Sequence, residues 1–417
     1  MPRYHIWTIG CQMNKAESER LGTCFEEHGY AESATADSVD VVVLNSCVVR
    51  RSAEERVINK LRALKSLKRD RPDITLAVTG CWVNSNVERL RQEFPHVDHF
   101  FGPGERPPWL DEAEWQAGRP FQGQPCAYVP IIRGCDNFCS YCIVPYRRGR
   151  EQSRPVDDIV CEVRERVHRG TREVTLLGQN VDSYGHDLPD RPDLADLLAE
   201  LNGIDGLARI RFLTNHPKDM SHRLIEAIAR LEKVCEHVSL PVQSGSNDIL
   251  EMMRRGYTVE DYRGLVSEIR RQVPGVALST DVIVGFPTET EAQFRETYEL
   301  LAGLRFDTVH VAAYSPRPQT SAARELPDDV PAVEKKRRLD QVERLQATIA
   351  SDISAGLLGR KVEVLVEGRK GGKWQGRTRT DRLAFFESSA DFRGKLATVA
   401  ITHTGTWSLQ GQPVTKA

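Results

Sequence analysis

The chain has 417 residues, more than one hydrophobic core usually holds, so we expect two or three domains. Hydrophobic residues make up 40% of the chain and charged residues 28%, as in ordinary globular proteins. The longest apolar runs are far shorter than a membrane span, and residues 1–5 do not resemble the start of a signal peptide. These features argue against a membrane protein and against a disordered chain.

The cysteine count and the net charge restrict the expected function further. Ten cysteines occur in a chain without a recognisable secretion signal, which favours reduced thiols and metal binding over disulfides. We therefore expect a cytoplasmic protein. The formal net charge is only −2, so a polyanionic partner would have to be met by a local basic patch.

The first hundred residues alternate between strand-like and helix-like stretches. We expect strands at residues 3–9, 39–44 and 75–78, separated by helices at 18–28 and 53–67. The middle strand is a continuous apolar run, as in a strand buried on both faces. This alternation predicts a small doubly wound parallel sheet. The proline-rich stretch 101–124 is then expected to be a linker.

A cysteine follows each of the three predicted strands: Cys11, Cys47 and Cys81. Because the carboxyl ends of neighbouring parallel strands meet at one edge of a sheet, these cysteines should come together in space. A single cysteine at a strand end is often only a small core residue. Three at the same topological position favour an iron–sulfur cluster with one iron left open.

Three further cysteines form a compact array, Cys135-x3-Cys139-x2-Cys142, after the apolar run 128–132. A loop with this spacing can hold three irons of a cubane cluster, whereas ferredoxin clusters have four cysteine ligands. The fourth iron would then be open to a small molecule. The alternative is a zinc site, which would need a distant fourth ligand because structural zinc is tetrahedral.

The central region repeats a strand–helix pattern. We expect strands at 128–133, 173–178, 209–213, 237–242, 277–284 and 308–314, with amphipathic helices between them. Six such units are too few to close an eight-stranded barrel, so the pattern predicts a partial, open barrel. Polar motifs follow several of these strands, and together they should line a pocket at the carboxyl edge, although each alone would suit an ordinary loop: 178–180, 214–216, 241–246, 280–287 and 314–317.

The basic run Arg147–Arg150, with Arg154 beyond it, follows the cysteine loop directly. Such a run is either a solvated face or a site for phosphates.

The sequence pattern changes in the last sixty residues, where we expect short strands of alternating residues separated by glycines. Five strands in this length predict a small barrel of oligonucleotide-binding type. Residues 356–417 contain 11 Lys and Arg against 5 Asp and Glu, and aromatic residues are interleaved with the cations. Stacking faces beside cations suit unpaired RNA bases. The alternative is that the aromatics are simply the core of the barrel.

These motifs together resemble the methylthiotransferases of the radical S-adenosylmethionine superfamily. The resemblance is carried by Gly10-Cys11-Gln12-Met13-Asn14, Asn45-Ser46-Cys47, Thr79-Gly80-Cys81 and the Cys135 loop, and it extends from about Arg3 to the C-terminus. Cys-Gln-Met-Asn is most similar to the MiaB branch. The resemblance implies three domains: an N-terminal domain at 1–119, a radical-SAM domain at 121–353 and a TRAM domain at 354–417, where Gly376-Arg377-Thr378 matches the usual TRAM motif.

The resemblance also implies the cofactors and their ligands. It implies S-adenosylmethionine and two [4Fe–4S] clusters, the first at Cys135, Cys139 and Cys142 and the second at Cys11, Cys47 and Cys81. The residues expected around S-adenosylmethionine are Gln179, Asn180, Gln243, Ser244 and Asp281, with Tyr141 packing on it or acting as a lid on the cluster. One departure stands out, because Gln319 occupies a position where the family more often has glycine.

The implied reaction adds a methylthio group to C2 of N6-dimethylallyl (isopentenyl) adenosine beside the anticodon of tRNA. S-adenosylmethionine serves as methyl donor and as source of a 5′-deoxyadenosyl radical, and no acid–base dyad is needed. We expect RNA contacts from Arg377, Arg379, Arg382 and Phe385. The implied partners are the tRNA anticodon stem-loop, a flavodoxin- or ferredoxin-type electron donor and a sulfur donor, and we expect a monomer.

Three alternatives remain at this point. The same chemistry could act on a threonylcarbamoyl adenosine or on an aspartate of a ribosomal protein. The third is a non-catalytic RNA-binding protein with structural clusters, but structural clusters are normally fully ligated, which argues against it.

Overall fold

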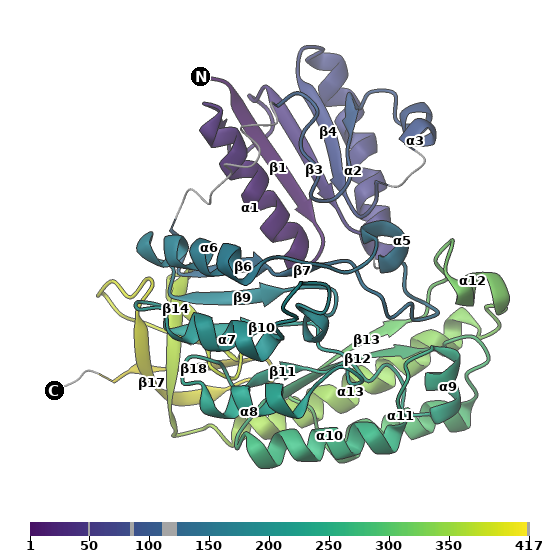
Figure 1. The fold of residues 1–417 in the computed structure, drawn as a ribbon, viewed down its shortest axis with the longest axis vertical. Helices are drawn as coiled ribbons and strands as arrows, with labels where there is room; N and C mark the ends of the chain where they lie inside the picture. The colour runs from purple at the N-terminus through teal and green to yellow at the C-terminus, as the bar shows by residue number, and fades with distance from the viewer. Residues whose placement is uncertain (49–50, 84–86, 111–122, 415–417) are drawn as a thin grey trace. The chain divides into compact units, whose positions relative to one another are not determined.

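The computed structural model describes residues 1–48, 51–83, 87–110 and 123–414 (Figure 1). The chain divides into two compact units. The first unit contains residues 1–122 together with Arg133–Asp136 and Cys142–Glu151, and the second contains Gly123–Ile132, Asn137–Tyr141 and Gln152–Ala417. Within the described ranges, no helix is both long enough and apolar enough to cross a membrane.

The first unit is built on a five-stranded parallel sheet in the order β2-β1-β3-β4-β5. Helices α1 and α2 lie on its two faces because successive residues of the central strand alternate in direction. Val41 and Val43 pack on the α1 side, while Val42 and Leu44 pack on the α2 side. The predicted doubly wound sheet is therefore confirmed. The elements are β1 (Arg3–Ile9), α1 (Gln12–Glu27), β2 (Ala31–Glu32), β3 (Val41–Ser46), α2 (Arg51–Asp70), β4 (Thr75–Gly80), α3 (Val87–Glu93) and β5 (His99–Phe100).

Helix α1 begins earlier than the hydrophobic pattern indicated. The pattern predicted a start at Ser18, whereas the helix starts at Gln12 with Cys11 as its N-cap. The side chain of Asn14 accepts a hydrogen bond from the backbone N–H of Cys11 at 3.2 Å, which completes a capping box. Cysteine is an unusual cap, so the sequence signal for this helix start was weak.

The second unit contains six parallel strands that form a partial barrel. They make two three-stranded sheets, β10-β9-β6 and β11-β12-β13, which are joined through a parallel bridge between Ile210 and Val234. The open six-stranded arrangement confirms the prediction. Its elements are β6 (Cys126–Pro130), α6 (Val156–His168), β9 (Glu173–Leu177), α7 (Leu194–Asn202), β10 (Arg209–Phe212), α8 (His222–Arg230), β11 (His237–Ser239), α9 (Asn247–Met252), α10 (Val259–Gln272), β12 (Ala277–Val284), α11 (Glu291–Leu304), β13 (Thr308–Ala313), α12 (Ser321–Glu325) and α13 (Ala332–Ala355).

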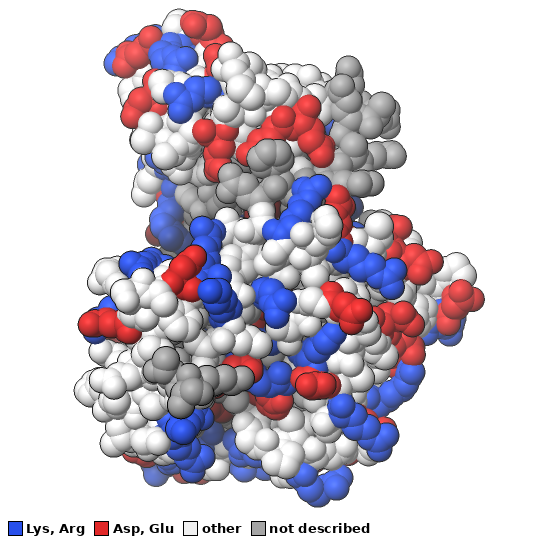
Figure 2. Space-filling model, turned by 90° about the vertical axis from the view of Figure 1, so that its left-hand side faces the viewer, with Lys and Arg blue, Asp and Glu red and all other residues white. Residues whose placement is uncertain are grey.

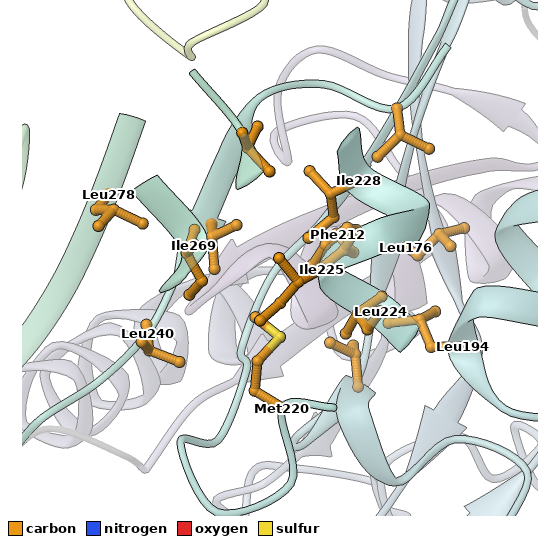
Figure 3. Packing of buried hydrophobic residues seen from close by; sticks show 14 of the residues in the cluster. Leu176, Leu194, Phe212, Met220, Leu224, Ile225, Ile228, Leu240, Ile269 and Leu278 are labelled. Atoms are coloured by element: carbon orange, nitrogen blue, oxygen red, sulfur yellow. The ribbon is translucent and has the colours of Figure 1, made fainter. Parts of the chain in front are cut away.

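One hydrophobic cluster joins the strands and the outer helices of this barrel. Figure 3 shows Leu224, Ile225 and Ile228 of α8 beside Phe212 of β10, and all four are buried. The spacing of the three α8 residues places them on one side of the helix. This packing holds the strands in register, so the loops that follow them stay at one edge.

The C-terminal segment forms a closed barrel of five strands in the order β14-β15-β16-β18-β17, as the short alternating strands predicted. The strands are β14 (Lys361–Lys370), β15 (Lys373–Thr378), β16 (Leu383–Phe386), β17 (Leu396–Thr404) and β18 (Ser408–Pro413). All pairings are antiparallel except that between β16 and β18, which is parallel and closes the barrel. Trp374 and Phe386 lie in its core.

Buried arginines attach this small barrel to the amino ends of the central strands. Arg209, at the start of β10, donates to the backbone oxygen of Arg377 at 2.8 Å and pairs with Glu363 at 2.8 Å. Two residues further on, Arg211 pairs with Glu173 at 2.8 Å and donates to the backbone oxygen of Arg379. The small barrel therefore covers the end of the central strands opposite to their carboxyl edge.

We predict that Arg211→Met lowers the free energy of unfolding by about 3–5 kcal/mol, because it leaves the buried Glu173 carboxylate without its hydrogen-bonded partner. Urea unfolding followed by tryptophan fluorescence measures the change. The control is Arg230→Met, since Arg230 is 76% exposed and its pairing with Glu226 should contribute only about 0–1 kcal/mol. Equal destabilisation by the two changes would contradict the role given to Arg211.

Candidate functional site

The three N-terminal cysteines lie at the ends of three adjacent strands in register. Ile9 pairs with Ser46, and Ser46 pairs with Gly80, so Cys47 and Cys81 each follow a paired residue directly, and Cys11 lies one residue further on, after Gly10. Cys47 donates a hydrogen bond to the sulfur of Cys11 and lowers the pKa of the Cys11 thiol to about 6. Burial raises the pKa of Cys81, and the nearby Cys11 raises it further. The structure thus brings these three thiols together.

Two glycines permit this close approach. A Cβ atom at Gly10 would lie 2.9 Å from the Cβ of Cys47 and 2.2 Å from Oδ1 of Asn14. Gly80 has a φ of 95°, which L side chains rarely adopt, and a Cβ there would lie 2.3 Å from the backbone oxygen of Ser46. The motif residues around the cysteines are therefore required by space as well as by chemistry.

Buried asparagines connect the two cysteine loops. Nδ2 of Asn14 donates to Oδ1 of Asn45 at 2.9 Å and to the backbone oxygen of Ser46 at 3.1 Å. In return, Nδ2 of Asn45 donates to the backbone oxygen of Asn14 at 2.8 Å. Both side chains are fully buried, so the loops that carry Cys11 and Cys47 are held by bonds that water does not compete for.

An arginine that the sequence placed in a basic surface run lies beside this array. Arg148 ends helix α5 (Val144–Arg148) and is only 6% exposed. Its Nε donates to the sulfur of Cys81 at 3.0 Å, and its Nη1 pairs with Glu17 at 2.6 Å. Burial by itself lowers the pKa of the guanidinium, but Cys81 and Glu17 raise it. Neither predicted reading of the run, a solvated face or a phosphate site, describes Arg148.

Hydrogen bonds within each of the two units hold the loop of Cys135, Cys139 and Cys142. In the first unit, the N–H of Cys135 donates to the backbone oxygen of Gly149 at 3.2 Å. In the second unit, the hydroxyl of Ser140 donates to the backbone oxygen of Met252 at 2.7 Å, and Lys218 donates to Asn137 at 2.6 Å. A left-handed residue, Phe138 with φ 46°, turns the chain between the first two cysteines.

A second buried arginine contacts this loop. Arg255 is 4% exposed, and its Nη1 lies 3.4 Å from the sulfur of Cys139 and 3.5 Å from the hydroxyl of Tyr141. Its Nη2 donates to the backbone oxygen of Pro241 at 2.9 Å. Each cysteine array therefore has a buried guanidinium on one of its sulfurs. The sequence carried no signal for either contact, because each arginine is far along the chain from the cysteine that it contacts.

Among the described residues, no group of three or more His, Cys, Asp or Glu side chains is close enough to hold one metal ion. In a cubane cluster each cysteine binds a different iron. Cys11, Cys47 and Cys81, at the ends of adjacent strands, are thiols of the kind that such a cluster uses.

The carboxyl edge of the partial barrel carries buried polar atoms that have no partner among the described residues. These atoms are Oδ1 of Asn180, Oδ1 of Asn215, Nε2 of His216 and Oε1 of Gln243. Buried polar atoms are normally hydrogen-bonded, so such a group at one edge indicates a place for a polar ligand. The predicted residues Asn180 and Gln243 belong to this group, whereas Asn215 and His216 were named only as part of a motif.

The other predicted ligands at this edge differ in what they offer. Gln179 and Asp281 are half-buried, and the backbone oxygen of Asp281 accepts from the N–H of Gln243 at 2.9 Å. Ser244 is fully buried, and its hydroxyl already contacts Thr297 and accepts from the N–H of Ser246. Ser244 therefore shapes the loop, and its role towards a ligand stays a prediction.

Several residues at this edge have a backbone conformation that usually requires glycine. Thr214 has a φ of 74°, Gln243 of 71° and Gln319 of 83°. Such conformations cost about 1–3 kcal/mol and occur preferentially at functional sites. The departure seen at Gln319 is thereby explained: the left-handed turn is kept here by a glutamine.

The buried carboxylate of Asp182 binds two of the residues at this edge. Its carboxylate accepts from the N–H of His216 at 2.9 Å and from the side chain of Asn215. Burial raises the pKa of Asp182 to about 7, and burial together with Arg255 lowers the pKa of His216. Hydrogen bonds to Asp182 thus hold Asn215 and His216 in place.

The predicted RNA-contacting residues occupy different environments. Arg379 pairs with Glu236 at 2.7 Å and Arg382 pairs with Asp307 at 2.7 Å, so both hold the small barrel to the central strands. Arg377 and Phe385 are half-buried at the barrel surface, where Arg377 pairs with Asp381 at 3.2 Å and with Glu367 at 3.6 Å. Trp407 is 59% exposed and offers a larger free face. On the face of the molecule in Figure 2, Lys and Arg side chains are interspersed with Asp and Glu.

Comparisons with known proteins agree with this architecture. The family model described as "Radical SAM superfamily" matches residues 129–301, and the TRAM domain model matches 357–414. A model described as "Uncharacterized protein family UPF0004" matches 3–102. A radical SAM methyltransferase from Kitasatospora setae has a similar fold, with a TM-score of 0.52 at 14% identity over 78% of this chain and 75% of that chain. The fold and the cysteine loop define a radical-SAM enzyme, whose cofactors are S-adenosylmethionine and a [4Fe–4S] cluster.

Curated relatives match over nearly the whole chain. A protein of Dehalococcoides mccartyi strain CBDB1 is 54% identical and covers 99% of both chains. A protein of Roseiflexus sp. strain RS-1 is 48% identical over 98% of this chain and 89% of its own. Both are named tRNA-2-methylthio-N(6)-dimethylallyladenosine synthase. The chain belongs to this family, which confirms the resemblance seen in its motifs.

We predict that Asn180→Ala weakens the binding of S-adenosylmethionine by about 1–3 kcal/mol, because it removes a buried polar group placed for a ligand. Equilibrium dialysis with the cluster-loaded protein measures the affinity. Asn202→Ala, at the end of α7, is the control and should leave the affinity unchanged. The same loss in both variants would contradict a direct role for Asn180.

Proposed function

We propose that this protein adds a methylthio group to C2 of N6-dimethylallyladenosine beside the anticodon of tRNA. The observation that carries the proposal is the convergence of Cys11, Cys47 and Cys81 at one sheet edge, in addition to the Cys135–Cys142 loop. A radical-SAM enzyme needs only the loop. The second array supports a reaction that also delivers sulfur, and the names of the relatives support the tRNA substrate.

The proposal assigns two [4Fe–4S] clusters to the two arrays. Cys135, Cys139 and Cys142 would hold the cluster whose chemistry, with S-adenosylmethionine, would provide a 5′-deoxyadenosyl radical. Cys11, Cys47 and Cys81 would hold the cluster whose chemistry would provide the sulfur. The chain's own residues bind and orient: Asn180 and Gln243 receive polar groups of S-adenosylmethionine, with Gln179, Ser244, Asp281 and Tyr141 around them. Ser140 and Asn137 keep the first loop in place through their contacts.

The arrangement of the second unit constrains how RNA binds. The small barrel lies at the amino ends of the central strands, whereas the buried polar atoms without partners lie at their carboxyl edge. An RNA that contacts both ends must extend along the length of the strands. We propose Arg377, Phe385 and Trp407 as contacts on the barrel and assign Arg379 and Arg382 to barrel docking.

The reaction also needs partners that the chain does not supply. We propose a flavodoxin- or ferredoxin-type electron donor, an external sulfur donor and a cytoplasmic location. The two donors follow from the chemistry, since the reaction consumes electrons and sulfur in each turnover.

We predict about eight irons per chain after anaerobic reconstitution, from two cubane clusters. Changing Cys135, Cys139 and Cys142 to Ala should halve the iron and abolish cleavage of S-adenosylmethionine. Changing Cys11, Cys47 and Cys81 to Ala should also halve the iron but leave 5′-deoxyadenosine formation intact, while methylthiolated nucleosides disappear from the tRNA digest.

The matched control changes two cysteines outside both arrays, Cys161 and Cys235, to Ser or Ala, and iron content should then be unchanged. Four irons in the wild-type protein, or methylthiolation that survives loss of the N-terminal triad, would overturn the proposal. Mass spectrometry of nucleosides from a deletion strain identifies which modified adenosine is lost, and thereby separates dimethylallyl from threonylcarbamoyl substrates.

We predict that Phe385→Ala weakens tRNA binding by about 1–3 kcal/mol through loss of a stacking face. Arg377→Gln should flatten the plot of log affinity against log salt by roughly 0.7–0.9 units, the effect of one lost phosphate contact. Arg382→Gln is the matched variant, because the side chain of Arg382 is only 12% exposed and pairs with Asp307, whereas that of Arg377 is 41% exposed; its slope should equal that of the wild type. Filter binding across a salt series gives all three values, and a slope changed by Arg382→Gln alone would reverse the assignment.

A further inference from the structure

A fork of hydrogen bonds joins Arg148 to one sulfur of the N-terminal triad. Its Nε lies 3.0 Å from Sγ of Cys81, while Nη1 and Nη2 lie 2.6 Å and 3.3 Å from the two carboxylate oxygens of Glu17. The side chain of Arg148 is 3% exposed and that of Glu17 is 13% exposed. Only a guanidinium can bind a carboxylate with two nitrogens and direct a third N–H elsewhere.

Helix α5 brings this guanidinium to its place. The helix starts two residues after Cys142, and Arg148 is its last residue. Before it, Ile143 packs in the same hydrophobic cluster as Cys81 and Trp82. The segment that leaves the radical-SAM loop therefore ends on a sulfur of the other cysteine array, and all of these residues belong to the first unit.

Packing alone does not explain the contact between Arg148 and Cys81. Three thiolates in one place repel one another, and burial makes that repulsion costly. A buried cation that donates directly to one sulfur offsets this charge. A clamp between α1 and α5 would need only the pair of Arg148 with Glu17, whereas Nε is turned to the sulfur.

We propose that Arg148 is a positioning residue that raises the reduction potential of the cluster held by Cys11, Cys47 and Cys81. The inference rests on the proposed function, because it assumes a cluster at that array. Hydrogen bonds to cluster sulfurs and nearby positive charge stabilise the reduced form, which carries one more electron. Glu17 keeps the guanidinium oriented, so that the N–H is directed at Cys81 before any cluster is loaded.

The test measures the midpoint potential of the second cluster in protein that lacks the first. Cys135, Cys139 and Cys142 are changed to Ala, the protein is reconstituted anaerobically, and reduction is followed by electron paramagnetic resonance during a redox titration. In this background we add Arg148→Met together with Glu17→Gln. The double change keeps the net charge of the pair and leaves no buried carboxylate unpaired, so it removes the N–H donor with little other disturbance.

We expect the double variant to shift the midpoint to more negative values, with the ratio of reduced to oxidised cluster at a fixed potential falling at least about tenfold, which corresponds to about 59 mV for one electron. Arg148→Lys keeps the charge but loses the fork, so its shift should be smaller and in the same direction. Arg150→Gln is the control from the same segment, because Arg150 is 72% exposed and pairs with Asp136, and the midpoint should not move.

The outcomes separate the inference from the function on which it rests. If the background protein holds no iron, the second cluster and the proposed function are wrong. If it holds a cluster whose midpoint is the same with and without Arg148→Met and Glu17→Gln, Arg148 is only a clamp and the inference is overturned. Should the double variant fail to load iron, Arg148→Lys decides by the same criterion, and an unchanged midpoint there also overturns it.

Discussion

Parallel pairing in register is the constraint on which the rest of the structure depends. In the first unit it sets β1, β3 and β4 level with one another, so the residues that follow them meet at one edge. The same rule places the polar ends of the central strands together in the second unit. Short loops after the strands are then enough to bring the cysteines and the polar side chains close together. Gly10 and Gly80 are the local consequence, because three cysteine loops at one edge leave no space for a Cβ atom.

Buried arginines recur wherever this protein must hold charge away from water. Arg148 and Arg255 each donate to a cysteine sulfur, while Arg209 and Arg211 carry the docking of the small barrel. The guanidinium suits these places because it keeps its charge when buried and presents several donors in a fixed plane. In each case the partner comes from a remote part of the chain, so these contacts tie segments together that the backbone does not.

The two ends of the central strands have different roles. The amino ends are covered by the small barrel through ion pairs, and the carboxyl ends carry the strained turns and the polar atoms without partners. Stability and ligand binding are thus separated along the strands. Part of the positive charge of the C-terminal segment takes part in this docking, since Arg379 pairs with Glu236 and Arg382 pairs with Asp307.

The sequence by itself determined the elements, the partial barrel, the small closed barrel and the grouping of the cysteines, because periodicity, turn residues and motif spacing are local signals and strand ends follow a general rule. It did not determine the start of α1, since cysteine is a rare cap, or the burial of Arg148 within a basic run. Nor did it distinguish the docking arginines Arg379 and Arg382 from surface cations. Only the tertiary structure decided these points, because the environment of a charged side chain depends on residues that are distant in sequence and brought near by packing.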